Sequence, residues 1–515
     1  MKAQRVEVST STKRVAYNMI FNVAAFLLNL GINFFVTPYI TKKFGAEAYG
    51  FVRLANDFAS YASIFSIALN SMASRFIMIE LAKGNKESVN KYYSSVMLAN
   101  IFLAGILVIP SGVCVIFVDK LLEVPQGLVF EVQLTFAITF GNFLLKLVFS
   151  TFENCFYMSN RLDIGAVGAM VSNIVKAVGI LALFVIFMPR ISYIAVGTLI
   201  ASVVLVLYNI YYTRKLIPGM RFSIKQFEKA KVVQVLSSGV WNSITRLSQI
   251  FSSGLDLLIT NLFIGSAEMG YLSVAKTIPN ILVGFNASVA NAFSPNLMIL
   301  YAKDDMQGLQ RTAKQAMKFM CLFVSLPNAV LISMGVEFFE LWIPGQPATL
   351  INVLSVLTII NSCITGPMQP LYQIFTITNK VRQSSVIMII YGFVSVLVTF
   401  ICLKTTEAGI YAVVIVSLVG SIIVALGYHL PYAAKYIGLP WYTFFPEIVK
   451  SIISLIVVCG VGFCVNGLLN MNTWTMWFFG AITTAVIGFI IDFCWMLNRE
   501  EKNRLICFVK KKLKK

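Results

Sequence analysis

Residues 44–83 read FGAEAYGFVRLANDFASYASIFSIALNSMASRFIMIELAK, and the first eight of these residues return 220 positions later. FGAEAYGF at 44–51 is echoed by IGSAEMGY at 264–271. Two further pairs share this spacing to within one residue: Ala82-Lys83 with Ala302-Lys303, and Ser159-Asn160-Arg161 with Thr378-Asn379-Lys380. Three matches at one spacing predict that the chain consists of two related halves.

The composition places the repeat in a lipid bilayer. The chain is 58% hydrophobic and only 12% charged, with a mean hydropathy of +0.80. Soluble proteins carry about 25% charged residues, which cover their surface. This chain has too few polar residues for such a surface, so we expect an integral membrane protein.

A helix that crosses a bilayer needs about 20 mostly apolar residues. Fourteen windows meet this condition and predict an all-α polytopic fold. They are 15–40, 48–79, 93–118, 129–152, 164–187, 192–212, 235–262, 268–300, 315–342, 350–377, 383–403, 408–429, 446–466 and 474–497.

The repeat offset corresponds to six helices, an even number that preserves the direction of the chain through the membrane. The two halves are therefore predicted to be parallel repeats related by an axis along the membrane normal. We expect a six-helix lobe in 1–212, a connection in 213–234, a second six-helix lobe in 235–434, and two extra helices with a basic tail in 435–515.

The basic residues are distributed unequally between the two sides of the membrane. With the N-terminus inside, the inner segments hold 29 Lys and Arg, whereas the outer segments hold only Lys42, Lys43, Lys120, Arg190 and Lys404. This asymmetry follows the positive-inside rule and places both termini in the cytoplasm. The net charge of +19 is thus explained by membrane topology rather than by nucleic acid.

The connection 213–234 (TRKLIPGMRFSIKQFEKAKVVQ) is the longest inner segment, and its basic and apolar residues alternate at roughly helical spacing. We expect a cytoplasmic amphipathic linker that lies on the anionic inner surface of the membrane. The tail FVKKKLKK has the same character.

Two predicted helices carry polar stripes. The second helix has Arg53, Asn56, Asp57, Ser60, Asn70, Ser71, Ser74 and Arg75 near a 3.6-residue period. The eighth helix repeats the stripe 220 residues later with Ser273, Lys276, Thr277, Asn280, Asn291 and Ser294. Polar groups at bilayer depth avoid lipid, so the stripes predict a central polar cavity. Its uncharged candidates are Asn56, Asn70, Asn280 and Asn291.

Basic residues predominate among the charges embedded in the windows. The candidate substrate-binding residues are Arg53, Arg75, Lys146, Lys176, Arg246 and Lys276. A cationic cavity with low-dielectric walls attracts anions, and arginine suits phosphate because its planar fork donates two hydrogen bonds at once. We therefore expect a substrate that carries phosphate.

Other roles for these charges remain open. Arg53 and Asp57 are spaced i, i+4 and would neutralise each other on one helix. Arg75 and Lys146 lie near inner ends, where long side chains reach the headgroups. Asp57 and Asp256 are candidates for binding a coupling proton or sodium ion.

The sequence offers little for enzyme chemistry. The outer loops are short, and no D-x-D motif is present. The nine cysteines include no C-x-x-C pair. The single histidine, His429, is insufficient for a metal site, and we expect it at the membrane interface. We expect a transporter that needs no cofactor or metal.

The run FGAEAYGFVRLANDFASYASIFSIALNSMASRFIMIELAKGNKE resembles bacterial oligosaccharide flippases of the O-antigen (Wzx) type. These belong to the multidrug/oligosaccharidyl-lipid/polysaccharide exporter superfamily. The resemblance is clearest over 13–160, weaker over 235–382, and mainly one of helix count over 383–515. It implies two six-helix bundles in a V-shaped arrangement, with two further helices.

The resemblance also implies a function. Such a protein flips an undecaprenyl-pyrophosphate-linked oligosaccharide, an O-antigen, capsule or other polysaccharide precursor, from the inner to the outer leaflet of the bacterial cytoplasmic membrane by alternating access. Its partners are the lipid-linked oligosaccharide, membrane lipids and polysaccharide assembly proteins. A lipid II flippase and a multidrug exporter are the alternative transporters, although the excess of embedded basic residues argues against the latter.

Overall fold

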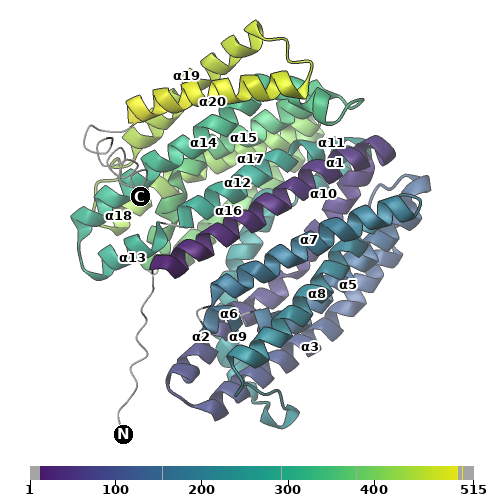
Figure 1. Ribbon diagram of the computed structural model, residues 1–515, viewed down its shortest axis with the longest axis vertical. Helices are drawn as coiled ribbons and strands as arrows, with labels where there is room; N and C mark the ends of the chain where they lie inside the picture. The colour runs from purple at the N-terminus through teal and green to yellow at the C-terminus, as the bar shows by residue number, and fades with distance from the viewer. Residues whose placement is uncertain are drawn as a thin grey trace. The chain divides into compact units, whose positions relative to one another are not determined.

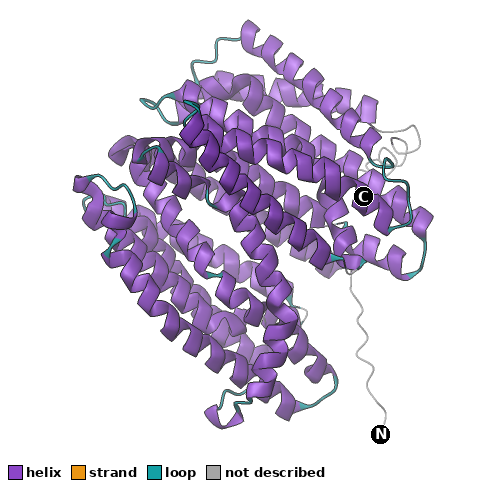
Figure 2. Ribbon diagram, turned by 180° about the vertical axis from the view of Figure 1, so that it is seen from behind, coloured by secondary structure: helices purple, strands orange, loops and turns teal. Residues whose placement is uncertain are grey.

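The computed structural model describes residues 12–153, 155–159, 161–291, 293–378, 380–496 and 502. These residues form helices joined by short loops, and no strand occurs among them (Figure 2). Within the described ranges, eleven helices are long and apolar enough to cross a membrane. They fall in eleven of the fourteen predicted windows, although Ile64–Leu81 fills only the second half of window 48–79, whose first half belongs to the preceding helix, Thr12–Ala62. The polytopic helical fold is therefore confirmed.

The other three windows are helical but differ in construction. Window 15–40 falls in the first part of α1 (Thr12–Ala62). Window 235–262 consists of α9 (Lys229–Gln249), the π-helix η3 (Ile250–Gly254) and α10 (Asp256–Phe263). Window 268–300 consists of α11 (Ser266–Ala275), α12 (Thr277–Asn291) and α13 (Ser294–Ala302).

The backbone breaks at equivalent positions of the repeat. Gly45 interrupts α1 at φ 85°, and Gly265 precedes α11 at φ 153°. Gly84 has φ 75° and Asp304 has φ 57°, again 220 residues apart. Positive φ is most accessible to glycine because it has no Cβ, which explains why the repeated motif contains glycine at its turn.

Helix caps follow the same offset. The Asn85 side chain accepts a hydrogen bond from the Ser88 amide at 3.1 Å and begins α3 (Lys86–Ile116). The Asp305 side chain accepts one from the Gly308 amide at 2.8 Å and begins α14 (Met306–Trp342). Such caps satisfy amides that lack a partner within the helix. The local structure thus repeats together with the sequence.

The chain forms two compact units. The first comprises residues through Phe44 and Phe51–Leu247, and the second comprises Gly45–Gly50 and residues from Ser248 onward. The boundary therefore falls in the last turns of α9. The division of the chain at 213–234 remains a prediction.

The first unit contains most of α1 together with the elements up to α9. Its further elements are α2 (Ile64–Ala82), α4 (Val118–Leu121), η1 (Gln126–Leu128), α5 (Val129–Glu153), α6 (Cys155–Met158), α7 (Leu162–Ile186), α8 (Tyr193–Leu216) and η2 (Ile224–Gln226). Helix α5 packs against α3 and α8, α7 packs against α8, and α2 packs against α3 (Figure 1). Ile77, Tyr93, Val96 and Cys155 are among the buried side chains of this unit.

The connection between α8 and α9 is not a continuous helix, although its basic and apolar residues alternate at roughly helical spacing. Pro218 and Gly219 follow the end of α8, and proline lacks the amide needed to continue a helix. The amides of Arg221, Ser223 and Glu228 donate to the side chains of Asn90, Ser94 and Ser95 in α3, at 2.8, 3.1 and 2.8 Å. These hydrogen bonds replace those that a helix would have supplied.

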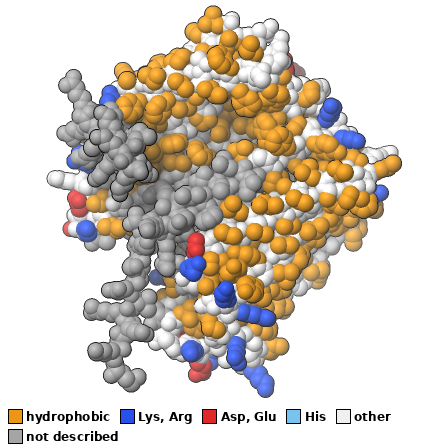
Figure 3. Space-filling view, viewed as in Figure 1, with side chains coloured by type: hydrophobic (Ala, Val, Ile, Leu, Met, Phe, Trp, Pro, Cys, Tyr) orange, Lys and Arg blue, Asp and Glu red, His pale blue; other side chains and the backbone are white. Residues whose placement is uncertain are grey.

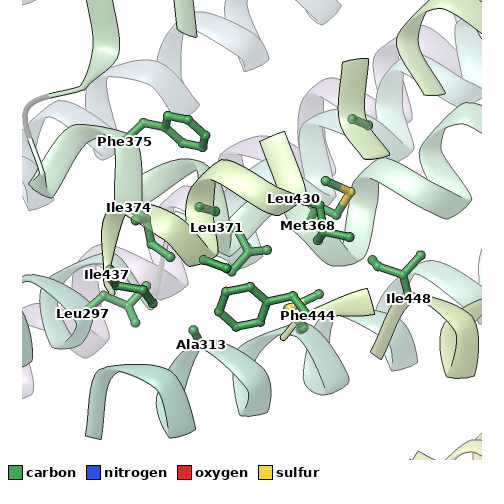
Figure 4. Close-up of a cluster of buried hydrophobic side chains, with 14 of the residues drawn as sticks. Leu297, Ala313, Met368, Leu371, Ile374, Phe375, Leu430, Ile437, Phe444 and Ile448 are labelled. Atoms are coloured by element: carbon green, nitrogen blue, oxygen red, sulfur yellow. The ribbon is translucent and has the colours of Figure 1, made fainter. Parts of the chain in front are cut away.

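The second unit is centred on α14. Its other elements are α15 (Ala348–Ile377), α16 (Val381–Thr405), α17 (Ile410–Val424), the π-helix η4 (Ala425–His429), α18 (Leu430–Tyr436), α19 (Phe445–Leu468) and α20 (Trp474–Met496). Helix α14 packs against α15, α19 and α20. Near its start, Leu297, Ala313, Met368, Leu371 and Phe444 form a tightly buried apolar cluster (Figure 4).

The two extra helices repair a break in α14. Met334 leaves the helical conformation at φ −131° and ψ 21°. Trp477 Nε1 donates to the Met334 carbonyl at 3.0 Å, and Asn466 Nδ2 donates to the Ser333 carbonyl at 3.0 Å. Carbonyls freed within a membrane need such partners because lipid offers none. The C-terminal helices are therefore structural parts of this unit.

The surface agrees with a membrane location. Figure 3 shows hydrophobic side chains over most of the visible face, with Lys and Arg gathered toward its ends. The exposed apolar residues include Phe102, Ile109, Val185, Leu207 and Ile423. In water these side chains would form a large unfavourable surface, whereas lipid solvates them.

Candidate functional site

The polar stripe of the first unit lies along α9. Asn242 Nδ2 donates to Ser71 Oγ at 3.0 Å, and Ser243 Oγ donates to the Ile64 carbonyl at 2.7 Å. On the same face of α2, between Ile64 and Ser71, the backbone of Ala68 lies so close to Gly239 of α9 that a Cβ on Gly239 would not fit. A partner helix thus satisfies part of the stripe that sequence reasoning assigned to a cavity.

Two of the predicted basic residues belong to this helix pair. Arg246 of α9 donates to Ser60 Oγ, which brings a predicted cation onto the predicted stripe. Arg53 is half-buried, and within the described ranges no hydrogen bond or ion pair joins its side chain to another residue. The alternative in which Asp57 neutralises Arg53 along one helix stays a prediction.

The asparagines of the first stripe face other helices. Asn56 Nδ2 donates to the Val52 carbonyl at 2.7 Å and lines a small cavity with Thr139 of α5 and Thr198 of α8. Asn70 forms a reciprocal amide pair with the buried Asn100 of α3, through hydrogen bonds of 3.1 and 2.9 Å. Asn70 thus joins α2 to α3.

Lys146 and Lys176 interact electrostatically, although they are 30 residues apart in sequence. Lys146 of α5 is exposed and Lys176 of α7 is half-buried, and they lie close enough to repel each other electrostatically. Neither has a carboxylate partner in the part of the chain that the structure describes. Two like charges that repel each other and lack a carboxylate partner favour a bound anion. Arg75 is exposed on α2.

Lys276 in the second unit already has an acidic partner. Its ammonium group forms an ion pair with Asp256, and the two side chains are only 13% and 9% exposed. Ser417 Oγ donates to the other Asp256 oxygen at 3.4 Å. Lys276 therefore stands where a coupling cation would bind to Asp256, and its charge is shared with a carboxylate.

The remaining predicted polar residues lie farther along the second stripe. Asn280 of α12 is exposed. Asn291 Oδ1 accepts a hydrogen bond from Gln373 Nε2 of α15 at 3.2 Å, and Ser294 Oγ donates to Gln373 Oε1 at 3.2 Å. This end of the stripe therefore contacts α15.

A polar cavity in the second unit escaped sequence reasoning. It is lined by Asn361, Thr365, Gln369 and Tyr372 of α15, and by His429 and other residues. The spacing of the α15 residues, i, i+4, i+8 and i+11, marks one helix face and was the available signal. His429 is 7% exposed, so its predicted interfacial position is wrong. The π-helix η4 directs it inward, against the Tyr372 ring at 5.0 Å.

The comparisons with known proteins agree with this architecture. A family model described as polysaccharide biosynthesis protein matches residues 15–298. The chain belongs to the polysaccharide biosynthesis protein family. It is 24% identical over 489 residues to a protein of Bacillus subtilis strain 168, described as the uncharacterized membrane protein EpsK, and the match covers 95% of this chain and 97% of that protein.

Solved structures show the same fold. The lipid II flippase MurJ in its inward closed conformation matches with a TM-score of 0.67 and 16% identity, over 92% of this chain and 97% of that chain. An inward-facing multidrug resistance MATE family transporter of the MOP superfamily matches with a TM-score of 0.57 and 14% identity, over 82% and 94%. At 16% and 14% identity, these likenesses show that this family member has the multi-pass helical fold of those two membrane proteins.

Proposed function

We propose that this family member flips an undecaprenyl-pyrophosphate-linked oligosaccharide from the inner to the outer leaflet of the bacterial cytoplasmic membrane. The observation that carries the proposal is that Lys146 and Lys176 repel each other and that neither has a carboxylate partner among the described residues. A pyrophosphate carries several negative charges, and it would relieve the repulsion between the two ammonium groups. The family, named for polysaccharide biosynthesis, supplies the glycan class.

Arg246 and Arg53 are proposed as further contacts of the pyrophosphate. Arg246 is oriented by Ser60, and an arginine held in place loses less side-chain freedom when it binds phosphate. We assign Lys276 a weaker role than the sequence suggested, since binding to phosphate would have to break its pair with Asp256. Asp57 remains the proposed coupling residue for a proton or sodium ion.

The charges of the embedded residues favour an anionic substrate over a cationic drug. A transporter for cationic drugs needs accessible carboxylates, whereas Asp256 is paired with Lys276 and Lys146 repels Lys176 electrostatically. An anionic lipid headgroup therefore fits the described charges better. With both termini in the cytoplasm, as the positive-inside asymmetry favours, the headgroup would be loaded from the inner leaflet.

The test is flipping of a fluorescent undecaprenyl-pyrophosphate glycan by the purified protein in liposomes. Lys176→Ala and Arg246→Ala should lower the rate roughly tenfold or more, since each removes a charge-assisted hydrogen bond. Lys120→Ala, whose ammonium lies over the Phe117 ring, is the matched control and should leave the rate unchanged. Export of a soluble cation without any flipping of the lipid would refute the proposal.

A further inference from the structure

The polar cavity of the second unit is built entirely from uncharged side chains. It has a volume of about 200 Å³, and its lining contains no Lys, Arg, Asp or Glu. Seven of the lining residues supply hydrogen-bonding groups from three elements: Ser252 of η3, Asn361, Thr365, Gln369 and Tyr372 of α15, and Ser417 and Ser421 of α17. Such a lining suits a neutral ligand with many hydroxyl groups and offers no charged side chain to an ion.

Two π-helical turns shape the cavity. Ser252 lies in η3 and His429 lies in η4, and π-helical turns are frequent at functional sites. Helix α16 packs closely against η3 at Gly392, where an added Cβ would lie 3.1 Å from the Ser252 amide nitrogen. The close approach depends on glycine at this position. The lining is therefore a specific construction rather than a gap between ordinary helices.

Several lining groups are satisfied within the protein. Ser421 Oγ donates to Asn361 Oδ1 at 2.5 Å, and Tyr391 OH donates to the Ser417 carbonyl at 2.9 Å. By contrast, the Gln369 amide and the Tyr372 hydroxyl have no hydrogen-bond partner among the described residues. Polar groups without partners are costly in a membrane protein. These two groups thus point to an occupant of the cavity.

We propose that this cavity binds one sugar ring of the transported glycan, an inference that rests on the proposed function. Hydroxyls of a sugar both donate and accept hydrogen bonds, as do the Gln369 amide and the Tyr372 hydroxyl. The Tyr372 and His429 rings give the apolar face of a sugar a surface to pack on. The volume is below the roughly 300 to 1,000 Å³ of sites for drug-sized ligands, which favours a single ring over a whole oligosaccharide.

The experiment compares two unlabelled competitors in the liposome assay: undecaprenyl pyrophosphate, and the same lipid bearing one N-acetylglucosamine. Each competes with flipping of a fluorescent undecaprenyl-pyrophosphate oligosaccharide. The wild-type protein should favour the sugar-bearing lipid. In Gln369→Ala and in Tyr372→Phe this preference should fall roughly three- to tenfold, the cost of one neutral hydrogen bond.

Tyr372→Phe removes a single oxygen and keeps the ring, so the fold should be retained. Thr358→Val is the control on the same helix, because Thr358 donates only to the Leu354 carbonyl and lies outside the cavity. Equal loss of competition by both lipids would overturn the proposal and indicate a hydrated path toward Asp256, which Ser417 contacts. An unchanged preference in both variants would also overturn it. If the wild type flips no lipid, the proposed function itself fails.

Discussion

Gly50 and Gly270, the equivalent glycines of the two repeats, pack directly against each other. A Cβ on Gly50 would lie 3.1 Å from the Gly270 Cα, and a Cβ on Gly270 would lie 2.6 Å from the carbonyl carbon of Ala46. Both residues belong to the second compact unit. Tyr49 OH and Thr277 Oγ, 3.2 Å apart, form a hydrogen bond beside them. The repeated motif thus encodes a contact between its own two copies.

This contact predicts an unusual response to alanine. Gly→Ala within a helix normally stabilises by up to about 1 kcal/mol, and Gly105→Ala, with nothing within 4 Å of its Cβ, should do so. Gly270→Ala should instead destabilise by about 1 to 3 kcal/mol, because the Cβ meets backbone atoms. Thermal unfolding of the detergent-solubilised protein measures both effects. A higher melting temperature for Gly270→Ala would show that the close packing is absent.

The neighbouring lysines predict non-additive transport defects. If Lys146 and Lys176 hold the same anion, each single alanine variant should reduce flipping roughly tenfold. The double variant should fall short of the product of the two effects, since residues that share a ligand are coupled. A double-mutant cycle measures this coupling. It compares the flipping rates in liposomes of the wild type, both single variants and the double variant. Strict multiplication of the two effects would mean that the lysines act separately.

The Lys276–Asp256 pair predicts a rescue. Lys276→Met leaves a buried carboxylate without its partner and should destabilise the protein by about 3 to 5 kcal/mol. Adding Asp256→Asn removes the orphaned charge, and most of the lost stability should return. Thermal unfolding of the two single variants and the double variant provides the comparison. A double variant less stable than either single one would contradict the pairing.

The amide pair of Asn70 and Asn100 predicts a stability effect in the first unit. Asn70→Ala leaves the amide of the buried Asn100 with fewer partners and should cost about 1 to 3 kcal/mol. Asn280→Ala, on an exposed face of α12, is the control with little expected effect. If Asn70→Ala lowers flipping while leaving thermal stability intact, Asn70 lines the substrate path as the sequence predicted.

Much of the fold could be predicted from the sequence because the bilayer permits few solutions. Apolar windows of sufficient length have to be helices, and the offset between Gly45 and Gly265 revealed the repeat. The breaks were harder to predict. Apolar periodicity does not distinguish a π-turn such as η4 from a regular helix, and the bend at Met334 is supported by distant partners such as Trp477.

The basic residues of the candidate site could be identified from the sequence, whereas the helices that they contact could not. Their place inside apolar windows identified Lys146 and Lys176, yet their electrostatic interaction depends on how α5 and α7 each pack against α8 within the first unit. The stripe was interpreted as a cavity wall, although α9 satisfies part of it through Asn242. A period of 3.6 residues identifies a polar face, and it does not distinguish water from another helix as the partner of that face.

The hydrogen bonds from Trp477 and Asn466 to the bend in α14 bear on the order of assembly. The chain is synthesised from its N-terminus, so α14 enters the membrane well before α19 and α20 exist. Until then, the Ser333 and Met334 carbonyls lack the partners that the finished unit gives them. The two carbonyls of the bend therefore gain these hydrogen bonds only once the last two helices have been inserted, so the bonding of this unit is completed from its C-terminal end.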